Sequence, residues 1–587
     1  MCGFVGGTLQ SDRYVQAANR LQHRGPDALG IWSDDRVTLG FRRLAVIDID
    51  PRSNQPMVSP DGTVAMVFNG EIYGFRDLKS TLEHHGYQFK TESDTEVLLY
   101  AYLQWGAHFV DRIDGMFAIA IYDQRSQQIT LWRDRVGIKP LYYFWNQKHF
   151  VFASELKAIQ ELLENQLQPN LEAYYDFLTY HAIPAPKTGF KNVFQLRPAH
   201  SIQFDLTNQR LSVPSRYWEL NVEPDHRMTF EDAQEQLREL LSRSVRDQLI
   251  ADVPVGCFLS GGVDSSILAY EGARATSKLK TFSMGFEGEP SELPYAREVA
   301  NHLGTEHYES ELPATAIDFN KLKEWFDEPF GDTSAFPTHA VAAAARQHVT
   351  VALAGDGGDE LFGGYRRYFQ YSNINLHLSH AFTWWERRKS HLLVHGNLRK
   401  GIDSVSYALA PPLERYLFLM SGLSREEKQP YVKSLGVSKD YDDLWAWREY
   451  WRPSLPIRTR MQFLDFHQYL QYDLLPKVDR VSMAVSLEVR VPFLAKSVIE
   501  LAFSVPESLR FRTGPKGLLR RTYEGCLPSA LLNRPKHGFG LPAGFRRFDL
   551  RKLGCVILNE SFDIPYPETF PVGNGAGRSG GVACHRG

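Results

Sequence analysis

The segment PVGCFLSGGVDSS, residues 254–266, decides the fold of the second half of the chain. It joins an apolar strand to a glycine turn and then to a helix predicted to begin at Asp264. Strands and helices continue to alternate after it, as far as the strand VTVALAG, residues 349–355. Alternation of this kind predicts a parallel, doubly wound sheet, in which ligands bind beyond the carboxyl ends of the strands. From about Arg366 onward the sequence predicts helices.

The turn SGGVDSS, residues 260–266, has the composition of a phosphate-binding loop. Gly261 and Gly262 permit a tight turn, and the N-terminus of the following helix offers N–H donors and the positive end of its dipole. Ser260, Ser265 and Ser266 add hydroxyl donors. The loop differs from the GxxxxGK[ST] pattern because no Lys follows the glycines. We therefore predict that this turn binds the phosphates of a nucleotide.

Asp264 lies among these phosphate donors, where a bare carboxylate would repel the phosphates. It is therefore predicted to bind Mg²⁺, and the alternative is a plain glycine turn with Asp264 as the helix N-cap. A second loop, AGDGGDELFGGYRR, residues 354–367, begins at the end of the strand VTVALAG. We expect Asp359 to share the Mg²⁺, and Asp356 to position an acceptor substrate or act as a base. The alternative for this loop is a solvated acidic turn.

The first part of the chain, to about Leu206, alternates short aromatic and β-branched strands with helices. One helix is expected near Phe75 and another after a cap at Asp94, within a mixed α+β domain of mostly antiparallel strands. Once Met1 is removed, the thiol of Cys2 would lie beside a free α-amine. That amine has a pKa of about 7.7–8.0 and can accept the thiol proton near neutral pH. The alternative is a buried strand cysteine without a chemical role.

Several segments of this first part together resemble the class II glutamine amidotransferases, which have an N-terminal-nucleophile αββα fold: MCGFVG (1–6), LQHRGPD (21–27), GFRRLAVID (40–48), FNGEIY (68–73), ESDTEV (92–97) and RDRVGIKPLYY (133–143). The resemblance implies that Arg43 pairs with the α-carboxylate of glutamine, because its planar fork matches a carboxylate. Asp94 would receive the α-ammonium, and Glu71 would help to orient the substrate. The Asn69 side chain, which would also contact glutamine, and the Gly70 N–H would form the oxyanion hole.

The second half resembles the synthetase domain of the glutamine-hydrolysing asparagine synthetases, an ATP-pyrophosphatase type of domain. The resemblance rests on SGGVDSS, on GDGGDELFGGY and on two later segments: LLPKVDRVSMAVSLEVRVPFL (474–494) and RPKHGFGLP (534–542). It implies that Lys536 neutralises phosphate charge in the transition state, and that Leu259, Met284 and Gly355 line the adenine and ribose pocket. Three charged residues of the 474–494 segment are at least as well explained by helix packing and surface charge as by catalysis: Lys477, Arg480 and Glu488.

These resemblances imply a two-site enzyme that uses ATP and Mg²⁺. Cys2 would release ammonia from glutamine, and the second site would convert a substrate carboxylate to an acyl-adenylate and then to an amide, with release of pyrophosphate and AMP. The simplest acceptor is aspartate. Ala354 replaces the usual Ser, Ala495 replaces an Asp, and Asp356 replaces a Glu, so two alternatives stay open: another carboxylate acceptor, such as a sugar uronate of surface-polysaccharide synthesis, and a non-catalytic paralogue. A β-lactam-forming synthetase fits less well, because such relatives lack the N-terminal Cys.

The expected organisation is a glutaminase domain over residues 2–206, a linker over 207–228, a synthetase domain over 229–545 and a Gly-rich, disordered tail over 546–587. The net charge of −3 gives no basic excess, so nucleic acid is not an expected partner. The five Cys form no CxxC pair, and no apolar stretch is long enough to span a membrane or to act as a secretory signal. We therefore expect a cytoplasmic protein; a homodimer is compatible with these features, and the oligomeric state stays open.

Overall fold

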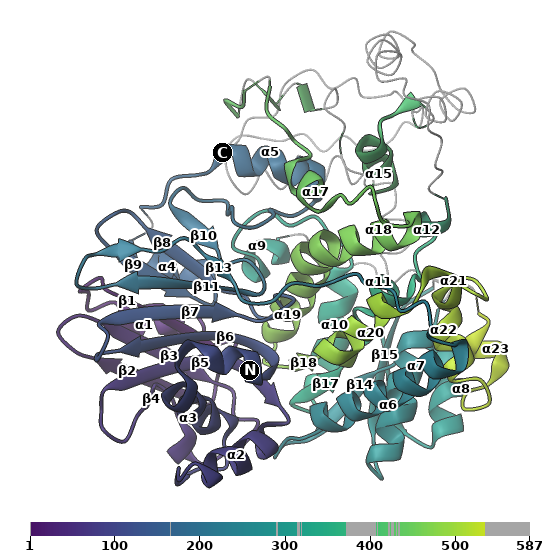
Figure 1. Ribbon diagram of the computed structural model, residues 1–587, viewed down its shortest axis with the longest axis horizontal. Coiled ribbons are helices and arrows are strands. Elements are labelled where there is room, and N and C mark those ends of the chain that lie inside the picture. Colours follow the sequence, from purple (N-terminus) through teal and green to yellow (C-terminus); the bar gives the residue numbers. More distant parts are fainter. Residues whose placement is uncertain are drawn as a thin grey trace.

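A computed structural model describes residues 2–534 apart from a few short gaps and one long one (Figure 1): 165, 289–290, 314–316, 319, 371–406, 408, 421–422, 424–427, 430, 433–434 and 439. The tail expected over 546–587 and the predicted catalytic Lys536 therefore lie outside the described residues. Within the described part of the chain, no helix is both long enough and apolar enough to cross a membrane.

The first half contains two antiparallel sheets. One has the order β10–β8–β9–β1–β3–β2, with these bounds: β1 (Gly3–Gly7), β2 (Ala28–Ser33), β3 (Thr38–Arg43), β8 (Tyr142–Trp145), β9 (Phe150–Ala153) and β10 (Val193–Gln195). The other has the order β12–β11–β7–β6–β5–β4, with β13 also paired to β11: β4 (Met57–Val58), β5 (Val64–Tyr73), β6 (Asp114–Asp123), β7 (Gln128–Arg133), β11 (His200–Asp205), β12 (Arg210–Leu211) and β13 (Ser215–Arg216).

The two sheets face each other across an apolar core, and helices cover their outer faces. Phe4 and Phe41 of the first sheet meet Val67 and Leu131 of the second in this core. A separate apolar cluster joins two helices to the first sheet, α1 (Tyr14–Asn19) and α4 (Leu156–Leu162). Another joins two helices to the second sheet, α2 (Phe75–His84) and α3 (Asp94–Trp105). The predicted four-layer αββα arrangement is thus confirmed, and α5 (Leu171–Tyr180) lies beyond it.

The second half is built on a parallel sheet in the order β16–β15–β14–β17–β18, as the strand–helix alternation predicts: β14 (Val255–Phe258), β15 (Lys280–Phe286), β16 (Glu306–Leu312), β17 (Val351–Leu353) and β18 (Glu488–Arg490). The order reverses next to β14, since β15 pairs with one side of this strand and β17 with the other. In an open α/β sheet such a reversal leaves a crevice at the carboxyl ends of the two strands. The two glycine-rich loops of the sequence follow these two strands.

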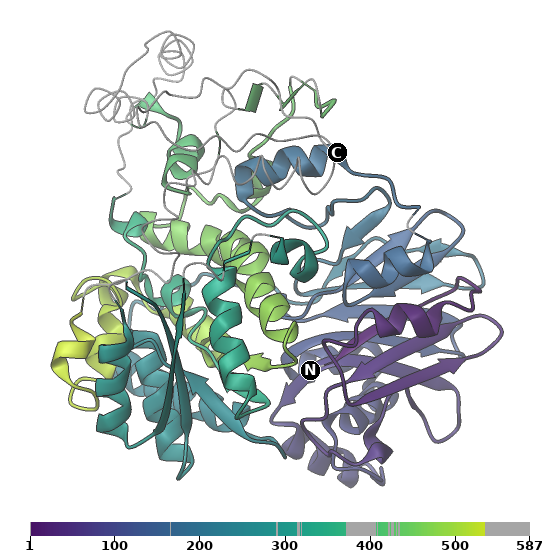
Figure 2. The same ribbon diagram turned by 180° about the vertical axis from the view of Figure 1, so that it is seen from behind.

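Helices cover both faces of the parallel sheet. α6 and α7 lie over the face that is nearer in Figure 1, and α10 and α19 lie over the face that is nearer in Figure 2. The helices that connect its first four strands, or precede them, are α6 (Phe230–Gln248), α7 (Val263–Ala275), α8 (Leu293–Leu303), α9 (Lys321–Trp325) and α10 (Ala335–Arg346). α6 begins where Thr229 and Asp232 form a capping box, and it buries Leu237, Leu241 and Val245 on one face.

The remainder of the described chain is mostly helical, as expected: α11 (Gly358–Phe362), α12 (Arg367–Gln370), α15 (Pro412–Met420), α17 (Trp445–Tyr450), α18 (Ile457–Asp465), a π-helical stretch (Phe466–Leu474), α19 (Leu475–Met483), α20 (Lys496–Ser504), α21 (Glu507–Arg510), α22 (Gly517–Thr522) and α23 (Ser529–Leu532). The strand β18 was not expected within this helical part. Its three residues pair with β17, so contacts far away in the sequence impose an extended conformation that a short local pattern does not signal.

Candidate active sites

Cys2 lies just before β1, and both ends of its backbone are held. Its N–H donates to Oδ1 of Asn69 at 3.0 Å, and its carbonyl oxygen accepts from Nε of Arg24 at 3.0 Å. The thiol contacts the carbonyl oxygen of Leu44 at 3.8 Å. Burial raises the pKa of the Cys2 thiol above its usual value. The thiol therefore needs an adjacent base before it can attack a substrate.

The predicted oxyanion-hole residues, Asn69 and Gly70, lie on β5 beside Cys2. The Asn69 side chain is fully buried, and its Nδ2 has no hydrogen-bond partner among the residues that the structure describes. Because Oδ1 is engaged by Cys2, the amide is fixed with this donor free. Gly70 leaves room for a close backbone approach, since a Cβ there would lie 2.0 Å from the carbonyl oxygen of Met116. An unpaired buried donor is uncommon and calls for a ligand.

The residues predicted to bind glutamine, Arg43, Glu71 and Asp94, are all buried close to Cys2. The Arg43 guanidinium donates to the carbonyl oxygen of Asp50 at 2.9 Å and to Oδ1 of Asn54 at 2.8 Å, which fixes its orientation. Burial raises the pKa of Asp94 to about 6. Burial, together with the charges of Glu488 and Asp94, also raises the pKa of Glu71 above its usual value. Nη2 of Arg490 already lies 3.4 Å from Oε1 of Glu71, and a ligand ammonium group would add a second positive charge to these acid groups.

The expected cap of α3 at Asp94 is wrong, and the correction favours a role in binding. Ser93 is the N-cap, and its Oγ accepts from the N–H of Thr95 at 3.1 Å. The Asp94 carboxylate instead accepts from the N–H of Ile72 at 3.0 Å, next to the predicted glutamine site. Its other oxygen, Oδ1, lies 3.4 Å from Oγ of Ser93.

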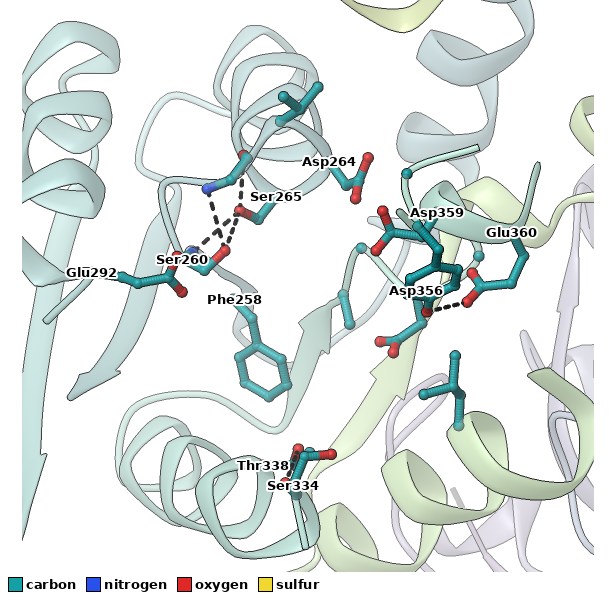
Figure 3. Close-up of a pocket in the computed structure, with 18 of the residues that line it drawn as sticks. Phe258, Ser260, Asp264, Ser265, Glu292, Ser334, Thr338, Asp356, Asp359 and Glu360 are labelled. Atoms are coloured by element: carbon teal, nitrogen blue, oxygen red, sulfur yellow. Dashed lines mark hydrogen bonds between the residues drawn. The ribbon is translucent and has the colours of Figure 1, made fainter. Parts of the chain in front are cut away.

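A cavity of about 770 Å³ opens at the carboxyl ends of β14 and β17 (Figure 3). Most of the residues predicted to bind the nucleotide, the metal and the acceptor line it: Leu259, Ser260, Gly262, Asp264, Ser265, Met284, Gly355, Asp356 and Asp359. Gly261 and Ser266 belong to the same turn but are not among the lining residues. Gly261 has φ +70°, and a Cβ there would lie 2.7 Å from Tyr295, so the turn requires glycine at this position.

The turn after β14 is held by its own serines. The N–H of Ser260 donates to Oγ of Ser265 at 3.2 Å, and that hydroxyl donates to the carbonyl oxygen of Gly262 at 3.2 Å. α7 begins at Val263, one residue before the predicted start, and its N-cap is Gly262, which has no capping side chain. Asp264 is therefore not the N-cap of this helix, which removes the plain-cap alternative. Its carboxylate is directed toward the loop that follows β17.

Asp264 and Asp359 come from the two loops and converge on a single cation, the Lys516 ammonium. Lys516 Nζ lies 2.6 Å from Oδ1 of Asp359 and also forms an ion pair with Asp264. The loops pack tightly, since a Cβ at Gly358 would lie 2.6 Å from Cγ of Asp264. Burial lowers the pKa of Lys516, but the two carboxylates outweigh it and hold the pKa above its usual value.

Sequence reasoning missed Lys516. The phosphate-neutralising role that the resemblance implies for Lys536 stays a prediction, because Lys536 lies outside the described residues. Lys516 lies in the segment GPKG, 149 residues beyond the end of the second loop, and only the fold brings it to the cavity. The signal in the sequence was the turn GPKG itself. In the structure Lys516 of this turn has φ +54°, immediately before α22. A non-glycine residue in this region of backbone space is uncommon and often marks a functional position.

The pair of carboxylates fits a magnesium ion that is also bound by phosphates. Mg²⁺ prefers oxygen ligands and commonly takes only one or two carboxylates from the protein, with substrate phosphates and water completing its shell. Among the described residues, no group of three or more His, Cys, Asp or Glu side chains is arranged to hold a metal. Asp264 and Asp359 already meet at one cation, so the donor set is the one that a nucleotide-bound Mg²⁺ needs.

The far end of the cavity contains Asp332, Asp356 and Lys477. Lys477 Nζ donates to Oδ2 of Asp332 at 3.0 Å and to Oγ of Ser334 at 2.8 Å. Burial raises the pKa of Asp356 above its usual value. Lys477 is thus a cavity residue and not a surface charge. Arg480 and Glu488 are also buried, but neither lines this cavity.

Taken together, these features define a protein with two separate sites, one around an N-terminal cysteine in an αββα domain and one at the strand-order reversal of a parallel sheet. Comparisons with known families agree with this division. Residues 1–218 match the family described as glutamine amidotransferase domain, and residues 236–561 match the family described as asparagine synthase.

Individual relatives match this chain over different lengths, and two of them match almost all of it. It is 34% identical to asparagine synthetase [glutamine-hydrolyzing] 1 of Bacillus subtilis, over 92% of this chain and 87% of that protein. It is 29% identical to asparagine synthetase [glutamine-hydrolyzing] 3 of the same organism, over 91% and 86%. A relative from Arabidopsis thaliana, asparagine synthetase [glutamine-hydrolyzing] 2, is 33% identical over 62% and 61%. The chain belongs to the family of glutamine-hydrolysing asparagine synthetases.

Proposed function

We propose that this protein is a glutamine-hydrolysing asparagine synthetase that makes ammonia at Cys2 and uses it at the ATP-binding cavity. The observation that carries the proposal is the pairing of these two sites in one chain. A held cysteine beside an unpaired buried amide suits acyl transfer. Two acidic loops that meet at a lysine, at the carboxyl ends of parallel strands, suit nucleotide chemistry.

At the first site, removal of Met1 frees the α-amine of Cys2, which takes the proton from the thiol. The thiolate attacks the side-chain amide of glutamine, and the resulting oxyanion accepts hydrogen bonds from Asn69 Nδ2 and from the Gly70 N–H. Ammonia leaves, and water hydrolyses the thioester to glutamate. Arg43 and Asp94 hold the α-carboxylate and the α-ammonium, so that the side-chain amide reaches the sulfur.

At the second site, the turn after β14 binds the phosphates of ATP through its N–H groups and serine hydroxyls. The acceptor carboxylate attacks the α-phosphate, which gives an acyl-adenylate and pyrophosphate, and ammonia then displaces AMP to form the amide. Asp264 and Asp359 would hold Mg²⁺, which would neutralise charge on the departing pyrophosphate. Lys516 supplies a second positive charge at the same point. Leu259, Met284 and Gly355 form the wall against which the adenosine packs.

Aspartate is the proposed acceptor. The far end of the cavity offers the carboxylates of Asp332 and Asp356 and the ammonium of Lys477, a mixed set that suits a substrate with one ammonium and two carboxylate groups. A sugar uronate is the second candidate, because Asp356 and Ala354 differ from the residues usual in aspartate-specific relatives. A uronate carries hydroxyls and no ammonium, so it would add no positive charge to Asp332 and Asp356, which would share the single ammonium of Lys477.

Acceptor-dependent release of pyrophosphate tests the proposal. The enzyme is assayed with Mg–ATP and glutamine, and with aspartate or glucuronate or galacturonate as the acceptor. We expect pyrophosphate and asparagine in equal amounts with aspartate, and only background with the uronates. Pyrophosphate release with a uronate but not with aspartate would show that the acceptor is a uronate. No release with any acceptor, together with no increase in melting temperature on adding Mg–ATP, would indicate a non-catalytic paralogue.

A further inference from the structure

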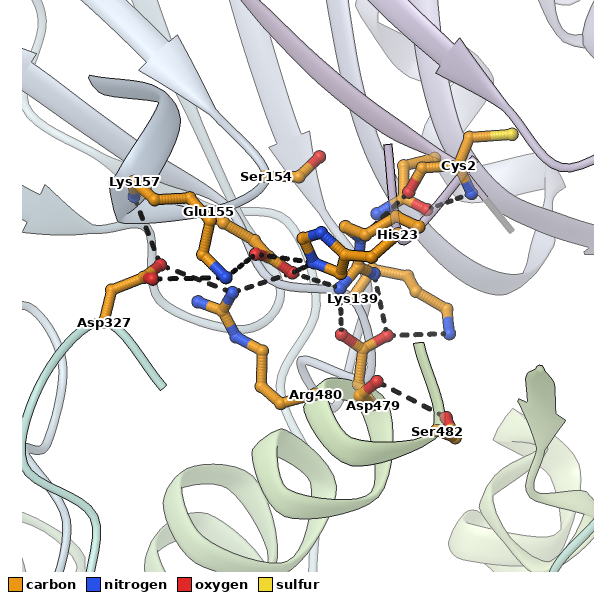
Figure 4. Close-up of polar contacts among 12 residues, drawn as sticks. Cys2, His23, Lys139, Ser154, Glu155, Lys157, Asp327, Asp479, Arg480 and Ser482 are labelled. Atoms are coloured by element: carbon orange, nitrogen blue, oxygen red, sulfur yellow. Dashed lines mark hydrogen bonds and ion pairs between the residues drawn. The ribbon is translucent and has the colours of Figure 1, made fainter. Parts of the chain in front are cut away.

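A group of charged side chains is buried where α19 of the second half meets the αββα domain (Figure 4). Ion pairs link the members, and none has a side chain more than 13% exposed: Arg24, Lys139, Glu155, Lys157, Asp327, Asp479 and Arg480. Asp479 and Arg480 come from α19, whereas Arg24, Lys139 and Glu155 belong to the first half. Charges this deep are stable only while every partner is in place.

Arg24 is held from two sides: its Nη1 donates to Oε1 of Glu155 in the first half at 2.8 Å, and its guanidinium also pairs with Asp479 of α19. The contact with Asp479 is bidentate: Arg24 Nη1 lies 2.8 Å from Oδ2 of Asp479, and Nη2 lies 3.0 Å from Oδ1. Such a fork-to-carboxylate pair fixes the plane of the guanidinium. Burial raises the pKa of Asp479, but the charges of Arg24 and Lys139 outweigh it and hold the pKa below its usual value, so the carboxylate stays ionised.

The remaining edge of the same guanidinium holds Cys2. Nε of Arg24 donates to the carbonyl oxygen of Cys2 at 3.0 Å. The N–H of Cys2 donates to Oδ1 of Asn69. These two hydrogen bonds fix the residue that would supply both the nucleophile and its base. A carboxylate on the second half of the chain therefore sets the position of the nucleophile in the first half.

The opposite side of α19 reaches the ATP-binding cavity. Lys477 precedes Asp479 by two residues, which places the two side chains about 200° apart around the helix. Lys477 is held by Asp332 and Ser334 in the cavity wall. One helix thus contacts the backbone of Cys2, through Arg24, on one side and the acceptor end of the cavity on the other.

We infer that Asp479 is a positioning residue for Cys2, and that glutamine hydrolysis depends on α19 being docked against the αββα domain. The inference rests on the proposed role of Cys2 as the nucleophile. Its consequence is that ammonia is made at full rate only when the helix that walls the acceptor end of the cavity is in place. Displacement of α19 would leave Glu155 as the remaining carboxylate partner of Arg24, so the guanidinium would no longer be held in the plane that reaches Cys2.

The test compares Asp479→Asn with Asp327→Asn, a matched control. Asp327 belongs to the same buried group and pairs with Lys157 and Arg480, but it does not contact Arg24. For Asp479→Asn we expect kcat for glutamate production to fall about 10- to 100-fold, since a misplacement of about 1 Å costs a factor of that order. KM for glutamine should stay within about twofold, because no glutamine-binding residue changes. Asp327→Asn should keep kcat within about twofold of wild type.

Alkylation of Cys2 by iodoacetamide, followed by peptide mass, provides a readout without glutamine. We expect faster alkylation of Cys2 in Asp479→Asn, because a loosened thiol is less buried and ionises more readily, and an unchanged rate in Asp327→Asn. Ammonium-dependent pyrophosphate release reports whether the second half is folded in each variant. If Asp479→Asn fails that control, Arg24→Lys takes its place. This variant keeps the positive charge but lacks the Nε–H group that donates to the carbonyl oxygen of Cys2.

Wild-type kcat in the folded Asp479 variant, or in Arg24→Lys, would overturn the inference. An equal loss in Asp479→Asn and Asp327→Asn would also overturn it, since the group would then act only as interface packing. Cys2→Ala separates this failure from failure of the proposed function. If Cys2→Ala still hydrolyses glutamine, the proposed function itself is wrong. If Cys2→Ala is inactive while Asp479→Asn is normal, only the inference about α19 is wrong.

Discussion

At the scale of single residues, the first site is a set of buried polar groups that lack only a substrate. Asn69 offers a donor with no partner among the described residues, and Asp94 has its pKa raised to about 6 by burial. Each of these features costs stability in the free protein. A ligand that brings an oxyanion and an ammonium group would satisfy both, and the proposed substrate glutamine would supply both groups during hydrolysis.

The pKa of Asp94 leads to a prediction about pH. An acid whose pKa is raised to about 6 is neutral below that pH, and a neutral carboxyl cannot pair with the α-ammonium of glutamine. We expect kcat/KM for glutamine to fall about tenfold per unit below pH 6, as the free enzyme takes up this proton. Asp94→Asn should have a low kcat/KM at every pH, with no inflection near pH 6. A flat wild-type profile between pH 5 and pH 7 would contradict the assignment.

Asp264 provides a second prediction at this scale. Asp264→Asn keeps the shape of the side chain but removes the charge that binds a hard divalent cation. Pyrophosphate release should fall on the order of 10³-fold or more, which is several kcal/mol of transition-state stabilisation. Glutamate production at Cys2 should persist, and it serves as the control for folding. Near wild-type pyrophosphate release would show that the carboxylate has no part in the chemistry.

At the scale of elements, the second site depends on two loops that touch. Parallel strands end at the same edge of the sheet, and the reversal of strand order brings the turn after β14 against the loop after β17. Gly358 is required there because its Cα lies against Asp264. The glycines of the second loop therefore serve the approach of the two loops as well as the approach of a ligand.

Gly358→Ala tests this contact. The new Cβ would lie 2.6 Å from Cγ of Asp264, so either the Asp264 carboxylate or one of the two loops must move. We expect the KM for ATP to rise and pyrophosphate release to fall by at least about tenfold, while glutamate production is unchanged. Normal kinetics with ATP would mean that the loops separate without consequence, and Asp264 and Asp359 would then not act as a pair.

The elements also show how far the sequence reaches. The strands β5 and β15 and the two glycine-rich loops follow from local patterns, and they are predictable because each signal lies within a few residues. The order of the αββα layers was implied by the family resemblance. Lys516 and β18 were not predicted. The first reaches Asp264 across 252 positions of the chain, and the second becomes a strand only through pairing with β17. Contacts between distant segments leave no local pattern in the sequence, so local patterns do not predict them.

At the scale of the whole molecule, one chain places an acyl-transfer site and a nucleotide site on two domains that share a buried, charged interface. Free ammonia is protonated in water near neutral pH, so a two-site enzyme benefits from domains that stay docked. Separate domains also allow each site to be inactivated without loss of the other. The two sites are thus expected to react independently of each other, although glutamine hydrolysis requires that the domains stay docked.

The most direct test compares two nitrogen sources in Cys2→Ala. Pyrophosphate release and asparagine formation are measured with glutamine and, separately, with ammonium chloride. We expect the variant to lose glutamate production and all glutamine-dependent synthesis, because the nucleophile is gone. Ammonium-dependent synthesis should stay within about twofold of wild type, because the second site keeps every residue. Equal loss of both activities, or continued production of glutamate, would contradict the two-site account.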